Sequence, residues 1–216
     1  MSQLIIDPAS VGKPTDTRSI ALLPQAAREF GYVPDLTLCL PGDLVLFRDP
    51  APGLIGRSIT SSQLNAGFSK EDAAWTHAAV YLDEDFVVEA IGEGVVTRSL
   101  YCDVPSRVMR IRRQLALSDI ERYRIALRAL RMLNTRYSKL EALRLGWNMK
   151  NGIWNGAGSP SFGRVVICSK VFYDAYLEIT RSALRDCPID HPVTPAHLSA
   201  TGSLSDVAIP WLKVQK

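Results

Sequence analysis

The pattern of hydrophobic and polar positions between residues 40 and 113 is that of a series of short strands. Turn residues separate five apolar or alternating runs: LVLF (44–47), THAAVYL (76–82), FVVEAI (86–91), GVVTRSL (94–100) and RVMRIRR (107–113). Short runs rich in Val, Ile and aromatic residues, bounded by Gly, Pro and Asp, are typical of β-strands. Pro41, Gly42 and Asp43 predict a turn before the first strand, and a short helix is expected near residues 55–64.

The periodicity becomes helical after residue 113. Ser118 and Glu121 have the spacing of a capping box, which predicts the start of a helix that ends near Asn134. The apolar stripe expected on this helix is Ile120, Tyr123, Ala126, Leu127, Leu130 and Leu133. A second helix is predicted to begin at Cys168, where a β-branched run gives way to apolar residues at helical spacing. Strands followed by helices predict an α+β fold with an antiparallel sheet packed against helices.

A chain of 216 residues suits one domain, or one domain with extensions. Residues 1–38 contain Pro8, Pro14, Pro24 and Pro34 and predict an irregular lead-in, so the single domain is expected over residues 39–216. Residues 144–163 are rich in Gly, Asn and Ser and predict a long loop.

The charge pattern gives no reason to expect a nucleic-acid partner, because the formal net charge is only +3. The arginines between residues 107 and 113 alternate with apolar residues, which predicts a strand with one basic, solvated face. The first residues lack the pattern of a secretory signal, and no apolar run approaches the length of a membrane span. We therefore expect the chain to be cytoplasmic as synthesised, unless a dedicated secretion system exports it.

The four cysteines form no CxxC pair, so each is judged as a single, reduced thiol. Cys39, Cys102 and Cys187 are expected to be structural. Cys187, His191 and His197 match no common zinc spacing and lack a fourth ligand. No metal and no cofactor are expected.

The hairpin over residues 76–91 predicts a pairing of chemical interest. If residues 83–85 form a three-residue turn, Leu82 pairs with Phe86 and Ala79 lies opposite Glu89. His77 shares a face with Ala79, so His77 and Glu89 become diagonal neighbours, roughly 7–8 Å apart at Cα. A two-residue turn would reverse the parity, and a bulge could also change the pairing.

Cys168 completes a candidate catalytic set with this pair. A carboxylate that accepts from one ring nitrogen orients an imidazole and leaves the other nitrogen free to move a proton. At a helix start the unpaired N–H groups favour a thiolate and can bind an oxyanion, so the Cys168 backbone N–H is the expected oxyanion donor. Glu89 lies within an apolar run, where a carboxylate is costly unless it is paired.

GDLVLF, WTHAAVYLDEDFVVEAIGEGVV and VICSKVFYDAY together resemble the circularly permuted, NlpC-like branch of the papain-like cysteine peptidases, over roughly residues 40–180. In that branch the histidine and its polar partner precede the cysteine helix. The resemblance implies Cys168 as nucleophile, His77 as base and Glu89 as orienting residue. It also implies hydrolysis of amide bonds, often in bacterial cell-wall (peptidoglycan) peptides.

Two other function classes stay open. Relatives in the wider group act on lipids, so a lipid or thioester acyl hydrolase or acyltransferase would use the same three residues. A non-catalytic binding module with a vestigial triad is the other alternative. Asp43, Trp147 and Trp154 are candidates for substrate binding. An exported cell-wall enzyme would be a toxin-like effector, with an immunity protein as its partner.

Overall fold

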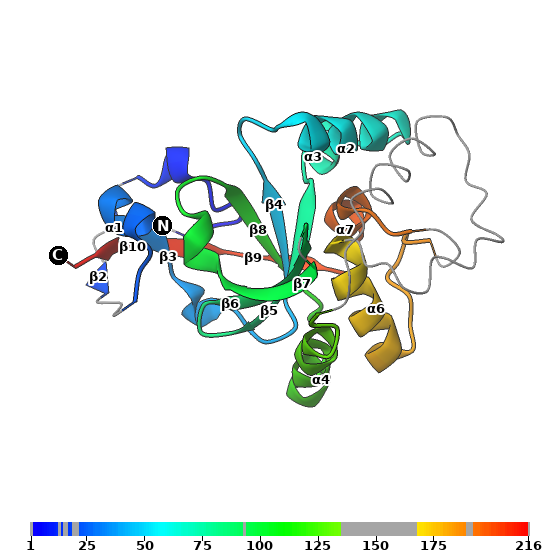
Figure 1. Ribbon diagram of the computed structural model, residues 1–216. Helices are drawn as coiled ribbons and strands as arrows, with labels where there is room; N and C mark the ends of the chain where they lie inside the picture. The colour runs from blue at the N-terminus through cyan, green and yellow to red at the C-terminus, as the bar shows by residue number, and fades with distance from the viewer. Residues whose placement is uncertain are drawn as a thin grey trace.

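The computed structural model describes residues 2–12, 14, 17–18, 22–92, 94–134, 168–188 and 192–215. Its main sheet has six strands in the order β7-β6-β5-β4-β8-β9, and every neighbouring pair is antiparallel (Figure 1). The strands are β4 Leu44–Arg48, β5 His77–Asp83, β6 Phe86–Ile91, β7 Gly94–Ser99, β8 Val108–Arg113 and β9 Ser205–Val207. With the helices that cover it, this sheet confirms the predicted α+β class.

Helices cover one face of the main sheet. Those around this face and its edge are α2 Leu54–Asn65, α3 Lys70–Ala73, α4 Asp119–Leu130, α6 Cys168–Thr180 and α7 Pro195–Ala200. One buried cluster joins Leu44 and Leu46 of β4 to Ile125 of α4 and Phe172 of α6. The helices predicted near residues 55–64 and at Cys168 are both present.

The two ends of the chain cover the other face, and the termini lie on the same side of the molecule (Figure 1). The elements here are β1 Ser2–Gln3, η1 Pro8–Ser10, β2 Thr17–Arg18, α1 Gln25–Phe30, β3 Tyr32–Pro34, η2 Leu36–Leu38, η3 Leu100–Asp103 and β10 Ile209–Val214. β10 pairs with β1, β2 and β3 to form a second sheet. The N-terminal lead-in therefore differs from the irregular segment that we expected, because its strands pair with β10 near the C-terminal end of the chain.

Burial on both faces explains why the strands read as nearly continuous apolar runs. Val45 and Phe47 belong to the cluster on the side of the chain ends, whereas Leu44 and Leu46 belong to the helical side. A strand buried on both sides has no solvated face and so shows no polar alternation.

The apolar stripe predicted for α4 is partly wrong. Its capping box of Ser118 and Glu121 is present, but Ile120, Tyr123 and Leu127 are exposed. The buried face consists of Arg122, Ile125, Ala126 and Ala129. Alanines allow the helix to approach closely, and the Arg122 guanidinium lies 3.7 Å from the buried Asp43 carboxylate. The buried face of α4 is therefore different from the predicted one, and it includes an arginine and two alanines that a ranking by hydrophobicity would place low among core residues.

The expected solvated basic face of β8 is also wrong. β8 lies between β4 and β9, and Arg112 is buried. Arg110 and Arg112 both bond to Asp206 on β9. Arg112 also donates to four carbonyl oxygens around the end of α7, those of Leu198, Ser199, Thr201 and Leu204. A guanidinium has five donors, so it can be buried where several acceptors converge.

The loop predicted over residues 144–163, with Trp147 and Trp154, lies outside the described residues. Within the described part of the chain, none of the helices is long and apolar enough to cross a membrane.

Gly42 and Gly31 offer a matched test of how the turn before β4 packs. Both have φ +82°, but a Cβ at Gly42 would lie 2.7 Å from the Arg122 carbonyl oxygen, whereas a Cβ at Gly31 meets nothing within 4 Å. Gly31→Ala should cost about 1 kcal/mol for the left-handed conformation, and Gly42→Ala at least about 2 kcal/mol because of the added clash. Urea unfolding of both variants measures the difference, and equal losses would show that α4 does not pack closely on this turn.

Candidate active site

The β5–β6 hairpin has the predicted register but not the predicted turn. Glu84 and Asp85 form a two-residue turn, and Asp83 pairs with Phe86. The register then shifts between Tyr81 and Asp83, which leaves Leu82 as an extra residue. The two deviations cancel, so Ala79 lies opposite Glu89 as predicted.

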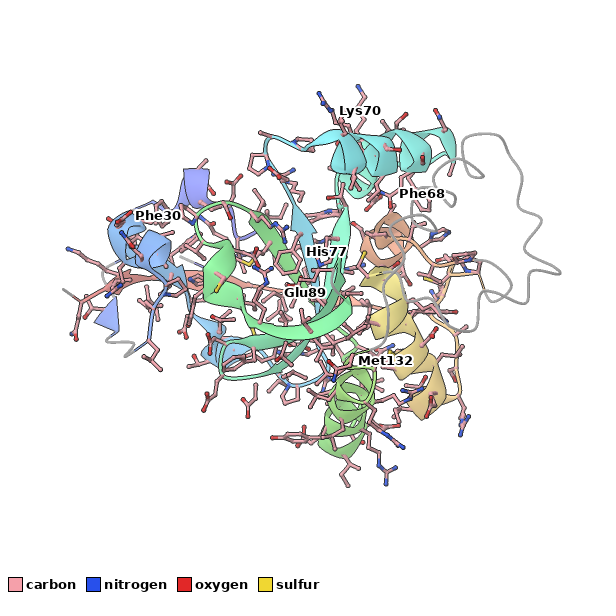
Figure 2. All side chains as sticks on the ribbon, viewed as in Figure 1. Phe30, Phe68, Lys70, His77, Glu89 and Met132 are labelled. Atoms are coloured by element: carbon pink, nitrogen blue, oxygen red, sulfur yellow. The ribbon has the colours of Figure 1, made fainter. Side chains whose placement is uncertain are left out.

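This register brings His77 and Glu89 together (Figure 2). His77 Nε2 lies 2.6 Å from Glu89 Oε2. Glu89 is fully buried, whereas 18% of the His77 side chain is exposed. The Phe47 ring lies beside the imidazole, with ring centroids 5.6 Å apart. The Glu89 carboxylate therefore holds one edge of the imidazole, and packing against the Phe47 ring limits where the imidazole can lie.

Arg98 is a member of the site that the sequence interpretation missed. Its Nε donates to Glu89 Oε1 over 2.5 Å, and its Nη2 donates to both carboxylate oxygens of Asp103. Asp103 lies on η3 and also faces Arg107, at 3.3 Å. Arg98 pairs with Val87 across the β6–β7 ladder, so it shares the face of Glu89. This alternation in FVVEAI and GVVTRSL was the signal that could have identified it.

Cys168 is the first residue of α6, as predicted, and 8% of it is exposed. The next residue anchors the helix start, because Ser169 Oγ donates to the Val193 carbonyl oxygen over 2.6 Å. The sulfur lies within reach of the His77 side chain and of the backbone N–H groups of Ala78 and Ser169, and all three lower the pKa of its thiol. The structure therefore brings Cys168, His77 and Glu89 together.

The contact between Cys168 and His77 depends on where the two elements begin. α6 packs on one face of the sheet, whereas Ala79 and Tyr81, which share the face of His77, belong to the opposite cluster. His77 is the first residue of β5, so no earlier strand residue separates the ring from the helix start. The imidazole can reach the sulfur around the end of the sheet.

The charges of the site stabilise one another. Burial opposes ionisation of Cys168, but the charge and hydrogen bond of His77 outweigh it and lower the pKa of the thiol. Burial also opposes the imidazolium, yet Cys168 and Glu89 raise the pKa of His77 to about 9. Burial raises the pKa of Glu89, but His77 and Arg98 outweigh it and lower that pKa to about 2. These shifts favour the pair of a thiolate and an imidazolium over the pair of a neutral thiol and a neutral imidazole.

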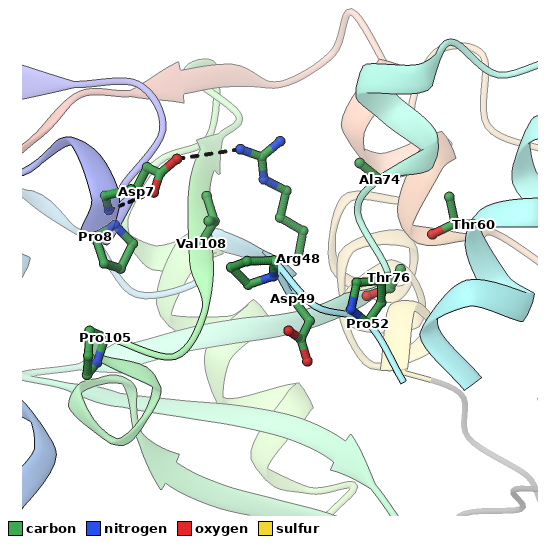
Figure 3. Close-up of a pocket in the computed structure, with 12 residues that line it drawn as sticks. Asp7, Pro8, Arg48, Asp49, Pro52, Thr60, Ala74, Thr76, Pro105 and Val108 are labelled. Atoms are coloured by element: carbon green, nitrogen blue, oxygen red, sulfur yellow. Dashed lines mark hydrogen bonds and ion pairs between the residues drawn. The ribbon is translucent and has the colours of Figure 1, made fainter. Parts of the chain in front are cut away.

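His77 and Cys168 line a pocket of about 590 Å³. Most of its walls are apolar, formed by Phe47, Pro52, Leu54, Ile55, Ile59, Ala90 and Ile91. Of the described residues that line it, Asp49 and Arg107 are the other charged ones. A second pocket of about 540 Å³ shares Asp49, Pro52 and Thr76 with the first and extends to Arg48 and Asp7 (Figure 3). The two pockets are therefore adjacent, and the first of them contains the His77 and Cys168 side chains.

Asp43 is not brought to this site. It is fully buried at the opposite end of β4, where its carboxylate accepts from Arg113 and from the Leu40 N–H. A structural ion pair therefore accounts for its position, in place of the substrate contact that we considered. Trp147 and Trp154 lie outside the described residues.

The other cysteines have no such environment. Burial raises the pKa of Cys39, and it raises the pKa of Cys187 to about 11. Cys102 is exposed on η3. In the part of the chain that the structure describes, no group of three or more His, Cys, Asp or Glu side chains could hold a metal ion.

A scan against protein-family models finds no match for this chain, and a search of curated proteins finds none either.

The thiolate at Cys168 predicts a distinctive alkylation profile. An ordinary thiol has a pKa of about 8.5 and loses reactivity about tenfold per pH unit below it, so Cys168 in the urea-unfolded protein gives the control profile. In the folded protein Cys168 should react with iodoacetamide nearly as fast at neutral pH as at alkaline pH. His77→Ala removes the main cause that lowers its pKa and should restore the ordinary profile. Peptide mass spectrometry measures Cys168 in both states; the same profile in the folded and the unfolded protein would refute the ion pair.

Proposed function

We propose that this chain is a cysteine hydrolase that cleaves amide bonds through an acyl-enzyme, with Cys168 as nucleophile, His77 as acid and base, and Glu89 as orienting residue. The observation that carries the proposal is the juxtaposition of the Cys168 sulfur with His77, which is itself hydrogen bonded to the fully buried Glu89, beside a pocket that Cys168 and His77 line. A nucleophile, a base and a group that orients the base are the parts of nucleophilic catalysis.

Acylation begins when the Cys168 thiolate attacks the carbonyl carbon and forms a C–S bond. The carbonyl electrons move to oxygen, where the Cys168 backbone N–H at the start of α6 donates to the oxyanion. When the tetrahedral intermediate collapses, the C–N bond breaks and the leaving nitrogen takes a proton from the His77 imidazolium. His77 is then neutral beside the Glu89 carboxylate.

Deacylation uses the same residues in the reverse roles. Neutral His77 removes a proton from a water molecule, which attacks the thioester carbonyl. The C–S bond breaks, a carboxylic acid is released, and the thiolate again lies beside an imidazolium. One water is consumed for each amide bond that is cleaved.

The order of the elements supports a circularly permuted, NlpC-like papain arrangement. The strand with His77 and the strand with Glu89 precede the helix that begins at Cys168, and this helix packs against the β5–β6 hairpin. By that resemblance, peptides of the bacterial cell wall are the first substrate class that we propose.

A lipid or thioester acyl substrate is the second candidate, and the pocket favours it. Seven apolar residues line the hollow beside Cys168, and Leu54 and Ile55 at its rim are 79% and 50% exposed. Apolar side chains exposed beside a reactive group favour substrates with apolar parts. The same thiolate chemistry would then break a C–O or C–S bond.

Mass spectrometry of purified peptidoglycan fragments and of phospholipids, each incubated with wild type and with Cys168→Ala, separates the two substrate classes. Cleaved peptides that carry one added water support the amidase. Released fatty acids or an acylated Cys168 support the acyl hydrolase. If neither substrate changes while Cys168 remains reactive to iodoacetamide, both substrate classes are wrong.

The roles of the three residues predict graded kinetic losses on whichever substrate is cleaved. Cys168→Ala and His77→Ala should abolish turnover, whereas Glu89→Gln should reduce it less because the amide oxygen still accepts from the ring. Turnover by wild type should fall as the pH rises through about 9, where His77 loses the proton for the leaving group. Glu89 raises the pKa of His77, so Glu89→Gln should move this limb to lower pH. If turnover by Glu89→Gln falls at the same pH as turnover by wild type, the role of Glu89 is contradicted.

A further inference from the structure

The site is the end of a longer series of alternating charges. In order of contact the members are Cys168, His77, Glu89, Arg98, Asp103 and Arg107. The two carboxylates in the interior are buried, with Glu89 at 0% and Asp103 at 2% exposed. The two ends, a thiolate and a guanidinium, both line the same pocket.

Arg107 is held in position by its neighbours. Its guanidinium carbon lies 5.7 Å from the centroid of the Phe47 ring, and the centroid of the His77 ring lies 5.6 Å from the same point. Phe47 is 1% exposed and is part of the central strand β4, so it is a rigid support. The Phe47 ring therefore supports both the guanidinium and the imidazole, and both side chains line the pocket.

One nitrogen of Arg107 is left without a hydrogen bond. Nη1 is buried, and among the residues that the structure describes it has no hydrogen-bond partner. Asp103 Oδ1 is 3.3 Å away, but the pair does not have hydrogen-bond geometry, and Asp103 also receives two bonds from Arg98. Nη1 itself is covered, but the Arg107 side chain is 35% exposed and lines the pocket, so the rest of the guanidinium can donate to a ligand there.

Among the described residues that line the pocket, Arg107 is the one lysine or arginine. Beyond His77 and Cys168, the charged residues that line it are Asp49 and Arg107, and Asp49 Oδ1 accepts from the N–H of Ala51 in its own loop. The walls between the two ends of the charge series are apolar. This arrangement fits an acyl group whose carbonyl lies at the sulfur and whose far end is anionic.

We propose that Arg107 is a specificity residue that binds a carboxylate on the acyl part of the substrate while the scissile carbonyl lies at Cys168. The inference rests on the proposed hydrolase and adds the charge of its substrate. A carboxylate would pair with the accessible part of a guanidinium that the Phe47 ring already orients, so binding would cost little further side-chain entropy.

The test compares two phenyl thioesters that differ only in charge, one of suberic acid and one of its neutral monoamide, suberamic acid. Wild type should hydrolyse the anionic thioester with a kcat/KM at least about tenfold higher, mainly through KM, since a hydrogen bond to a charged group is worth about 1.5–3 kcal/mol. Arg107→Gln should lower kcat/KM for the anionic thioester toward the value for the neutral one, so that the preference is lost. Arg107→Lys should keep part of the preference.

Arg57→Gln is the matched control, because Arg57 is an exposed arginine on the neighbouring α2 that does not line the pocket. It should keep the full preference for the anionic thioester. Equal hydrolysis of the two thioesters by wild type, or an unchanged preference in Arg107→Gln, would overturn the role of Arg107.

If wild type hydrolyses neither thioester, the proposed hydrolase fails on these probes and binding decides the question for Arg107. Calorimetric titration of Cys168→Ala with monomethyl suberate and with the methyl ester of suberamic acid then replaces kinetics. Tighter binding of the anion that is lost on adding Arg107→Gln supports the proposal. Equal binding of the two esters refutes it.

Discussion

Burial of the Glu89 carboxylate is the constraint on which the candidate site depends. A carboxylate with no exposed surface is stable only when charged donors surround it, and His77 and Arg98 supply them from the two strands that flank β6. Together these contacts hold the imidazole in one orientation and favour its protonated form. The same charge then stabilises the thiolate at the start of α6. Removing the Glu89 carboxylate would therefore weaken the imidazolium of His77 and, through it, the thiolate of Cys168.

Much of this arrangement could be predicted from local patterns. Apolar runs located the strands, the capping box located α4, and the change of periodicity located the start of α6. The pairing of His77 with Glu89 was also predicted, although for a turn that is not the one present. Parity explains this outcome: a bulge and a shorter turn each change the alignment by one position, so two deviations restore it. The pairing of Asp43 with Arg113 could not be predicted, because it joins residues far apart in the chain.

The predictions that failed concern arginines and the chain ends. Hydrophobicity places Arg112 and Arg122 outside, yet both are buried where carbonyl or carboxylate oxygens converge. Such acceptor sets come from elements that meet only in the folded chain, such as the end of α7. The short strands near the N-terminus likewise pair with β10, which is nearly the length of the chain away. Single-sequence patterns contain no information on contacts of that range.

The bulge at Leu82 has a consequence for how distant relatives would be found. A tight reversal with one extra residue and a wider reversal without it lead to the same alignment of His77 and Glu89. What both loop shapes preserve is the separation of twelve positions between these two side chains. Homologues could therefore exchange one loop for the other without loss of the acid–imidazole contact, and a search keyed to that interval would recover chains that a search keyed to the loop sequence would miss.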